Sequence, residues 1–83
     1  MNFKQEKETL KFFINNLENL ISLSDEAEVL LEQTKKALEE VENADKLPKE
    51  KLAQFKKDIA KKIKGLEYDL DGLIDSLTPI DLN

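Results

Sequence analysis

The chain contains no cysteine, histidine, arginine or tryptophan. The lack of cysteine excludes disulfides and thiolate chemistry, and the lack of histidine removes the side chain that most often serves as a general base or metal ligand. Without arginine, no guanidinium is present to hold a phosphate with two parallel hydrogen bonds. These absences exclude most catalytic arrangements, so we expect a protein that is not an enzyme, with no catalytic residues, no cofactor and no metal site.

Glycine and proline are also scarce, with two of each in 83 residues, and no apolar run approaches the about 20 residues that cross a bilayer. An apolar content of 40% with four phenylalanines and one tyrosine leaves only a thin core, which excludes a large enzyme with an enclosed substrate pocket. The charged N-terminal residues do not form a signal peptide. We therefore expect a single cytoplasmic domain over residues 1–83, without a membrane partner.

Apolar residues recur at spacings of three and four along three segments, which is the pattern of amphipathic helices. Ser24 is well placed to cap the second segment, and Pro48 is well placed as the first residue of the third. We therefore expect an all-α antiparallel three-helix bundle with a short tail at 78–83. The predicted helices cover about residues 3–22, 25–44 and 48–77.

The third predicted helix carries the most regular apolar stripe and also both glycines. Its apolar positions are separated by 3, 4, 4, 3, 4, 3 and 4 residues, a heptad-like repeat with one stutter. Gly65 and Gly72 each cost about 1 kcal/mol relative to alanine inside a helix. The helix is expected either to continue through Gly65 or to bend or break there. The stripe consists of Leu52, Phe55, Ile59, Ile63, Leu66, Leu70, Leu73 and Leu77.

The length of the third helix draws attention to its C-terminal end. A helix of about 20 residues measures roughly 30 Å, whereas residues 48–77 would give roughly 45 Å. Laid antiparallel on the second helix, the third is expected to extend about ten residues beyond it, with an apolar stripe too large to leave in water. Either the chain folds back at Gly65 as a fourth short helix, or a partner covers this stripe.

The formal net charge of −5 is the sum of four distinct blocks. Residues 1–23 are neutral, residues 24–45 carry −6, residues 46–64 carry +6 and residues 65–83 carry −5. The two opposite blocks belong to neighbouring helices and are expected to complement each other along their edges. The alternative is that the lysine-rich block binds nucleic acid. Because no arginine is present to recognise a guanine edge, nucleic acid is not expected as a partner.

The segment 67–78 is similar to the calcium-binding loop of EF-hand proteins. Oxygen-bearing side chains stand at its first, third, fifth and ninth positions, and Gly72 stands at the sixth. It departs from the motif where the motif matters most, since Glu67 replaces the first aspartate and Thr78 replaces the last glutamate. Pro79 also prevents an exiting helix. The simpler interpretation is a helix with one apolar and one acidic face, so calcium is not an expected cofactor.

Together these features predict a small protein-protein interaction protein, of the size common among adaptors, chaperones, immunity factors and phage or plasmid accessory proteins. Its C-terminal acidic helix is expected to bind another protein or a second copy of the chain, with apolar anchors and an acidic rim that orients a basic partner. The alternative is an acidic inhibitor that mimics nucleic acid and blocks a nucleic-acid-binding partner. The predicted anchors are Leu66, Leu70, Leu73, Ile74 and Leu77, and the predicted rim is Asp69, Asp71 and Asp75.

Overall fold

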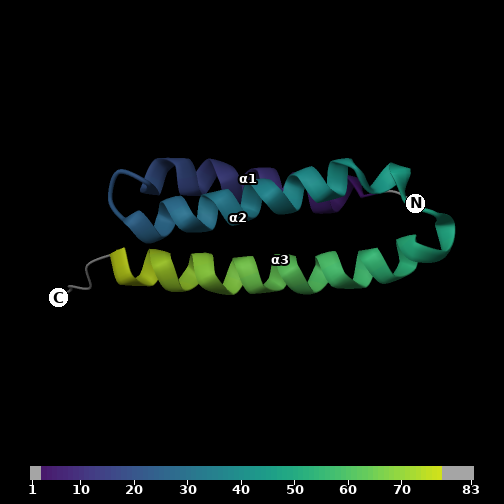
Figure 1. Cartoon of the computed structure of the whole chain (residues 1–83). Helices are drawn as coiled ribbons and strands as arrows, with labels where there is room; N and C mark the ends of the chain where they lie inside the picture. Colours follow the sequence, from purple (N-terminus) through teal and green to yellow (C-terminus); the bar gives the residue numbers. More distant parts are fainter. Residues whose placement is uncertain (1–2, 78–83) are drawn as a thin grey trace.

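The computed structural model describes residues 3–77, which form an antiparallel bundle of three helices (Figure 1). The helices lie side by side along one axis, and the molecule measures 52 × 20 × 17 Å. The predicted all-α three-helix bundle is confirmed, while the predicted tail at 78–83 lies outside the described residues. The elements are α1 (Lys4–Leu20), α2 (Asp25–Glu42), a 3₁₀ turn η1 (Ala44–Lys46) and α3 (Lys49–Leu77).

Local sequence signals set the start of α2 and of α3. The Ser24 side-chain oxygen accepts a hydrogen bond from the backbone N–H of Glu26 at 3.1 Å, which satisfies one of the free donors at the N-terminus of α2. The Pro48 carbonyl accepts a hydrogen bond from the Lys51 N–H at 2.9 Å. Pro48 therefore stands immediately before α3, and the helix begins one residue later than predicted.

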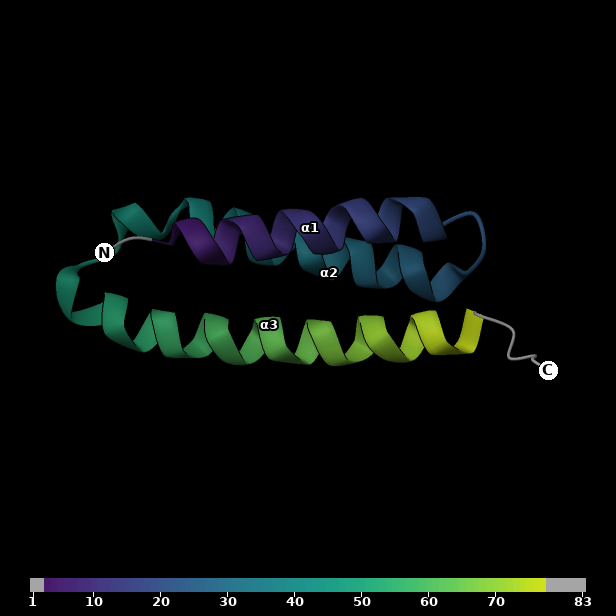
Figure 2. The same ribbon diagram turned by 180° about the vertical axis from the view of Figure 1, so that it is seen from behind.

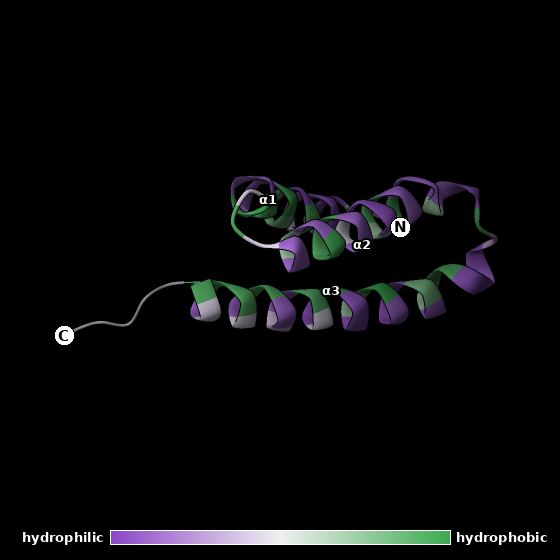
Figure 3. Ribbon diagram, turned by 60° about the vertical axis from the view of Figure 1, so that its left-hand side comes forward, coloured by the Kyte–Doolittle hydropathy of each residue, from purple (hydrophilic) through white to green (hydrophobic). Residues whose placement is uncertain are grey.

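The α1–α2 hairpin is the most closely packed part of the bundle, and α3 lies farther from both helices (Figure 3). The buried face of α2 is rich in small residues, among them Ala27, Thr34 and Ala37. Small side chains allow a neighbouring helix axis to come close. The buried Thr34 hydroxyl donates a hydrogen bond to the Leu30 carbonyl at 2.8 Å. This hydrogen bond compensates for the loss of water around the hydroxyl group.

Helix α3 lies along the whole length of the hairpin and does not extend beyond it (Figures 1 and 2). Its last turns are level with the first turns of α2, since Gly72 and Ser76 line the same groove as Glu26 and Val29. The predicted overhang of α3 is wrong because the prediction compared the length of α3 with the length of α2 alone. The connection containing η1 adds length at one end of the hairpin, and the turn between α1 and α2 adds length at the other.

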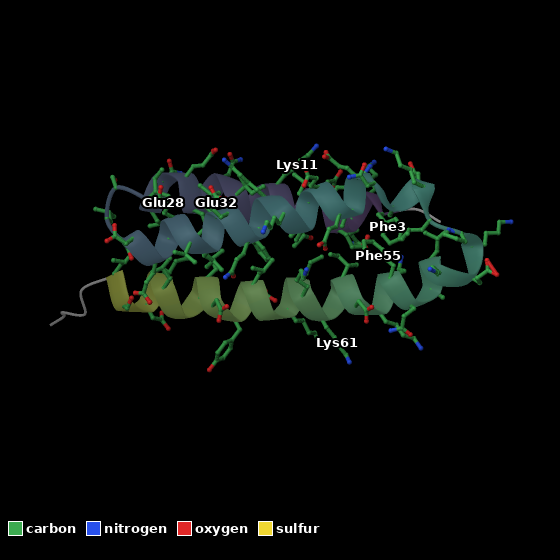
Figure 4. The ribbon with its side chains drawn as sticks, viewed as in Figure 1. Phe3, Lys11, Glu28, Glu32, Phe55 and Lys61 are labelled. Carbon is green, nitrogen blue, oxygen red and sulfur yellow. The ribbon has the colours of Figure 1, made fainter. Side chains whose placement is uncertain are left out.

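One continuous apolar cluster joins the three helices. Leu10 and Leu17 of α1 are fully buried, and Ile59 of α3 is nearly so. At the end of the bundle near the N-terminus, the rings of Phe3 and Phe55 meet edge to face with centroids 5.5 Å apart (Figure 4). Within residues 3–77, none of the helices combines the length and the hydropathy needed to span a bilayer. The buried apolar residues are Phe3, Leu10, Phe13, Leu17, Ala27, Leu30, Leu31, Ala37, Val41, Ala44, Ile59, Leu66, Leu70 and Leu73.

Leu73 provides a test of this packing, because it is 7% exposed while its neighbour Ile74 is 37% exposed. Replacing Leu73 with aspartate removes buried apolar area and places a charge in the core. We predict that Leu73→Asp lowers the free energy of unfolding by more than about 3 kcal/mol, out of a total of about 4 to 12 kcal/mol for a chain of this size. Urea titration followed by circular dichroism measures the change, and Ile74→Ser serves as the milder control. A Leu73→Asp variant as stable as the control would contradict the packing described.

The two glycines of α3 provide a second test. The helix runs without a break through Gly65 and Gly72, and a Cβ placed at either position has no heavy atom within 4 Å. The variant Gly65→Ala/Gly72→Ala is therefore expected to gain helix propensity without a clash, about 2 kcal/mol in all. The midpoint of thermal unfolding should rise by about 8 to 16 °C. The reverse change at exposed Ala60, Ala60→Gly, should lower it, and unchanged midpoints would refute the interpretation.

Candidate partner-binding surface

The fold places the two longest lysine-free segments of the chain beside each other. Residues 12–34 and 65–77 contain no lysine. The end of α1, the start of α2 and the end of α3 all lie at the same end of the bundle (Figure 1). We call these two segments the acidic half. Its nine carboxylates, with no cationic side chain among them, belong to Glu18, Asp25, Glu26, Glu28, Glu32, Glu67, Asp69, Asp71 and Asp75.

The remaining described residues, 3–11 and 35–64, form the basic half. They hold all thirteen lysines against eight carboxylates, a formal surplus of five positive charges. In the side-chain view, Glu28 and Glu32 lie near one end of the molecule and Lys61 lies nearer its middle (Figure 4). The molecule is therefore polarised along its long axis.

Opposite charges pair with each other in the basic half. Ion pairs join Lys62 to Glu40 at 3.2 Å and Lys56 to Glu6 at 3.6 Å. The Lys56 ammonium also lies 5.5 Å from the ring centroid of Phe3, within the range of a cation–π contact. The expected complementarity between α2 and α3 is thus found at one end of the helices, because the acidic residues that begin α2 lie next to the acidic residues that end α3.

The large apolar side chains that remain exposed lie in the acidic half as well. Tyr68 is 80% exposed and Leu23 is 65% exposed, and none of the exposed large apolar residues belongs to the described basic half. Phe12 is exposed, whereas its neighbour Phe13 is buried. Scattered apolar residues are common on protein surfaces, but their restriction to the half with uncompensated charge is typical of an interaction surface. The residues are Phe12, Ile21, Leu23, Val29, Tyr68 and Ile74.

A groove between α2 and α3 opens to solvent in the acidic half. Its volume is about 500 Å³, and its apolar lining includes Val29, Leu30 and Leu73. Carboxylates stand on both walls, Glu26 on α2 and Asp69 on α3. We call this hollow the α2–α3 groove. The other lining residues are Gln33, Tyr68, Gly72 and Ser76.

A second hollow of about 360 Å³ continues the groove toward the basic half. It shares Gln33 and Asp69 with the first, so the two hollows are adjacent along the same pair of helices. Its walls carry Lys36 and Lys62 in addition to carboxylates. The charge of the groove walls therefore changes along the groove, from acidic at one end to mixed at the other.

The predicted apolar anchors lie mainly inside the bundle. Leu66, Leu70 and Leu73 are at most 7% exposed and form part of the core, and Leu77 packs against that core. These residues hold α3 on the hairpin, although Leu66 and Leu73 also line the two hollows. Ile74 alone of the predicted anchors is exposed.

The predicted acidic rim is divided between two surfaces. Asp69 lines the α2–α3 groove, whereas Asp71 and Asp75 are exposed without lining it. The groove also contains Glu26 and Val29 of α2, which the sequence interpretation did not select. The exposure of Val29 could have been predicted from the sequence. This apolar residue falls outside the three-and-four spacing of the buried face of α2, which places it on the surface.

The segment with the calcium-loop resemblance is helical over the residues described. Residues 67–77 belong to α3, so the winding loop of an EF-hand site is absent there, and position 78 lies outside the described residues. In the described part of the chain, no group of three or more acidic residues is placed to hold a metal ion. The resemblance is therefore limited to the sequence.

Comparison of the chain with protein-family models, with curated proteins and with solved structures finds no match. The surface is accordingly interpreted from its own geometry and charge.

Proposed function

We propose that this chain is a non-enzymatic helical protein that binds another protein through its acidic half. The observation that supports the proposal is that the exposed apolar side chains and the uncompensated carboxylates share this half. Buried apolar contacts supply most of the affinity at an interface, while charge complementarity speeds encounter and selects the partner. A partner segment with basic residues around an apolar stripe would be complementary to both features.

A second copy of the chain is a poorer match than a different protein. Two acidic halves repel each other, since each carries nine carboxylates and no lysine. The basic half of a second copy offers charge but, within the described residues, no exposed large apolar side chain to pack against Leu23 or Val29. A homodimer formed through this surface would therefore pair the carboxylates of the acidic half with lysines but would leave its exposed apolar side chains without an apolar partner.

The composition and the shape of the surface both support a binding role over catalysis. The chain has no histidine or cysteine, which are the usual nucleophiles and bases near neutral pH. Both hollows between α2 and α3 are open to solvent, whereas catalytic sites generally enclose their substrate. An open groove is better suited to an extended partner segment.

An acidic inhibitor that mimics nucleic acid is the second candidate, favoured by the charge density of the acidic half. The 13 residues of α3 in this half span about 20 Å, so nine carboxylates give about one negative charge per 2 Å. Double-stranded DNA carries one per about 1.7 Å. The exposed apolar residues are not needed for such mimicry, and they favour the first candidate.

Matched charge variants test the role of the acidic half. Glu18→Gln/Glu28→Gln/Asp75→Asn removes three charges there, and Glu42→Gln/Glu50→Gln/Asp58→Asn removes three from the basic half. We predict that the immobilised wild-type chain and the basic-half variant retain the same basic protein from a lysate of the source cell at 0.15 M salt. The acidic-half variant should retain about three-fold less of it, because three of the carboxylates that attract the partner are gone. Equal retention by the two variants, with unchanged helicity, would refute the proposal.

Competition separates the two candidates. We predict that Val29→Ser weakens binding of the captured partner about ten-fold, since it removes an exposed apolar contact without disturbing the core. Double-stranded DNA should not displace the partner. Titration by surface plasmon resonance measures both effects. Displacement by DNA together with an unchanged affinity of Val29→Ser would instead support nucleic-acid mimicry.

A further inference from the structure

We infer that the α2–α3 groove binds a single amphipathic helix of the partner, with an apolar face directed into the groove and basic residues along both edges. This inference rests on the proposed function and specifies its binding mode. A helix is the natural occupant of a furrow between two parallel-axis helices, because its side chains form ridges that fit such grooves.

The dimensions of the groove fix the length of the bound segment. The two adjacent hollows extend from Glu26 to Glu40 along α2, which is 15 residues and a rise of about 21 Å. A partner helix of about four turns therefore fills them. Residues spaced three and four apart on one face of that helix would contact the apolar lining at Val29, Leu30 and Leu73.

The α3 wall of the groove has no side chain at two positions, because both are glycine. Gly72 lines the first hollow and Gly65 the second, one heptad apart on the same side of α3. Since a Cβ at either position would meet no heavy atom within 4 Å, the packing of the bundle itself gives no reason for glycine. The space above them lets a fourth helix approach α3 more closely than larger side chains would permit.

Charge on the groove walls selects the sign of the side chains on the bound helix. Glu26 and Asp69 stand on opposite walls at the acidic end, where lysine or arginine on both edges of the helix would reach a carboxylate. Lys36 and Lys62 stand at the other end. The basic residues of the bound helix are therefore best placed at the acidic end of the groove.

The direct test uses a synthetic 18-residue peptide with leucines at helical three-and-four spacing and lysines on both flanks. Fluorescence anisotropy of the labelled peptide, titrated with the full chain at 0.15 M salt, gives its Kd. One control peptide has the same composition in scrambled order, and another has glutamate in place of every lysine. We expect both controls to bind at least ten-fold more weakly, because each lacks one of the two complementary features.

Matched variants locate the peptide on the surface. The groove pair Glu26→Gln/Asp69→Asn should weaken binding at least five-fold. The pair Glu28→Gln/Asp71→Asn removes the same charge from the same two helices outside the groove lining, and should cost about two-fold through long-range attraction alone. Gly72→Gln should weaken binding at least ten-fold by filling the groove while thermal stability stays the same or rises. Ala60→Gln is its control outside the groove.

The outcomes distinguish the binding mode from the function. If the lysine peptide binds but the two charge pairs weaken it equally and Gly72→Gln has no effect, the groove inference is wrong and the proposed function stands. If a natural basic partner is captured through the acidic half but the lysine peptide fails to bind, the groove inference is again wrong. If light scattering shows a mass of twice 9.6 kDa that Gly72→Gln abolishes, a second copy occupies the groove instead.

Discussion

The burial of the apolar stripe of α3 along the whole α1–α2 hairpin is the interaction on which the rest of this structure depends. A chain of 83 residues has a thin core, and the large side chains of α3 supply one side of it. That burial sets the register of α3, with Gly72 and Ser76 level with the first turns of α2. The register in turn brings two acidic segments together, although 30 residues of sequence separate them.

The same register has an electrostatic cost in the acidic half. Like charges on neighbouring helices repel over distances up to the Debye length, about 10 Å at 0.1 M salt. Leu66, Leu70 and Leu73 offset this repulsion by the apolar area that they bury. Asp25, Glu26 and Glu28 gain a favourable interaction with the dipole of α2, since they stand in its first turn. No lysine lies within the acidic half to neutralise its carboxylates. The three leucines that were predicted as partner anchors thus stabilise the fold, and in this way they position the acidic surface.

Periodicity and capping were sufficient to predict the helices. The spacing of Leu66, Leu70 and Leu73 and the cap at Ser24 both follow from local rules. The length of the hairpin does not follow from local rules, because the distance spanned by a loop and a 3₁₀ turn depends on tertiary packing. The same limit applies to charge, since block totals do not show which parts of two antiparallel helices become neighbours. The α2 side of the groove, including Glu26, required knowledge of which edge of α2 faces α3.

The contacts of Lys56 with Glu6 and with the ring of Phe3 imply that the two ends of the bundle respond to ionic strength in opposite ways. Added salt screens this attraction, and so loosens the first turns of α3. It also screens the repulsion among carboxylates at the far end, and so tightens the last turns. Amide hydrogen exchange along α3 should then accelerate at one terminus and slow at the other as salt rises. The salt dependence of amide exchange along α3 alone would thus reveal the charge polarity of the whole molecule.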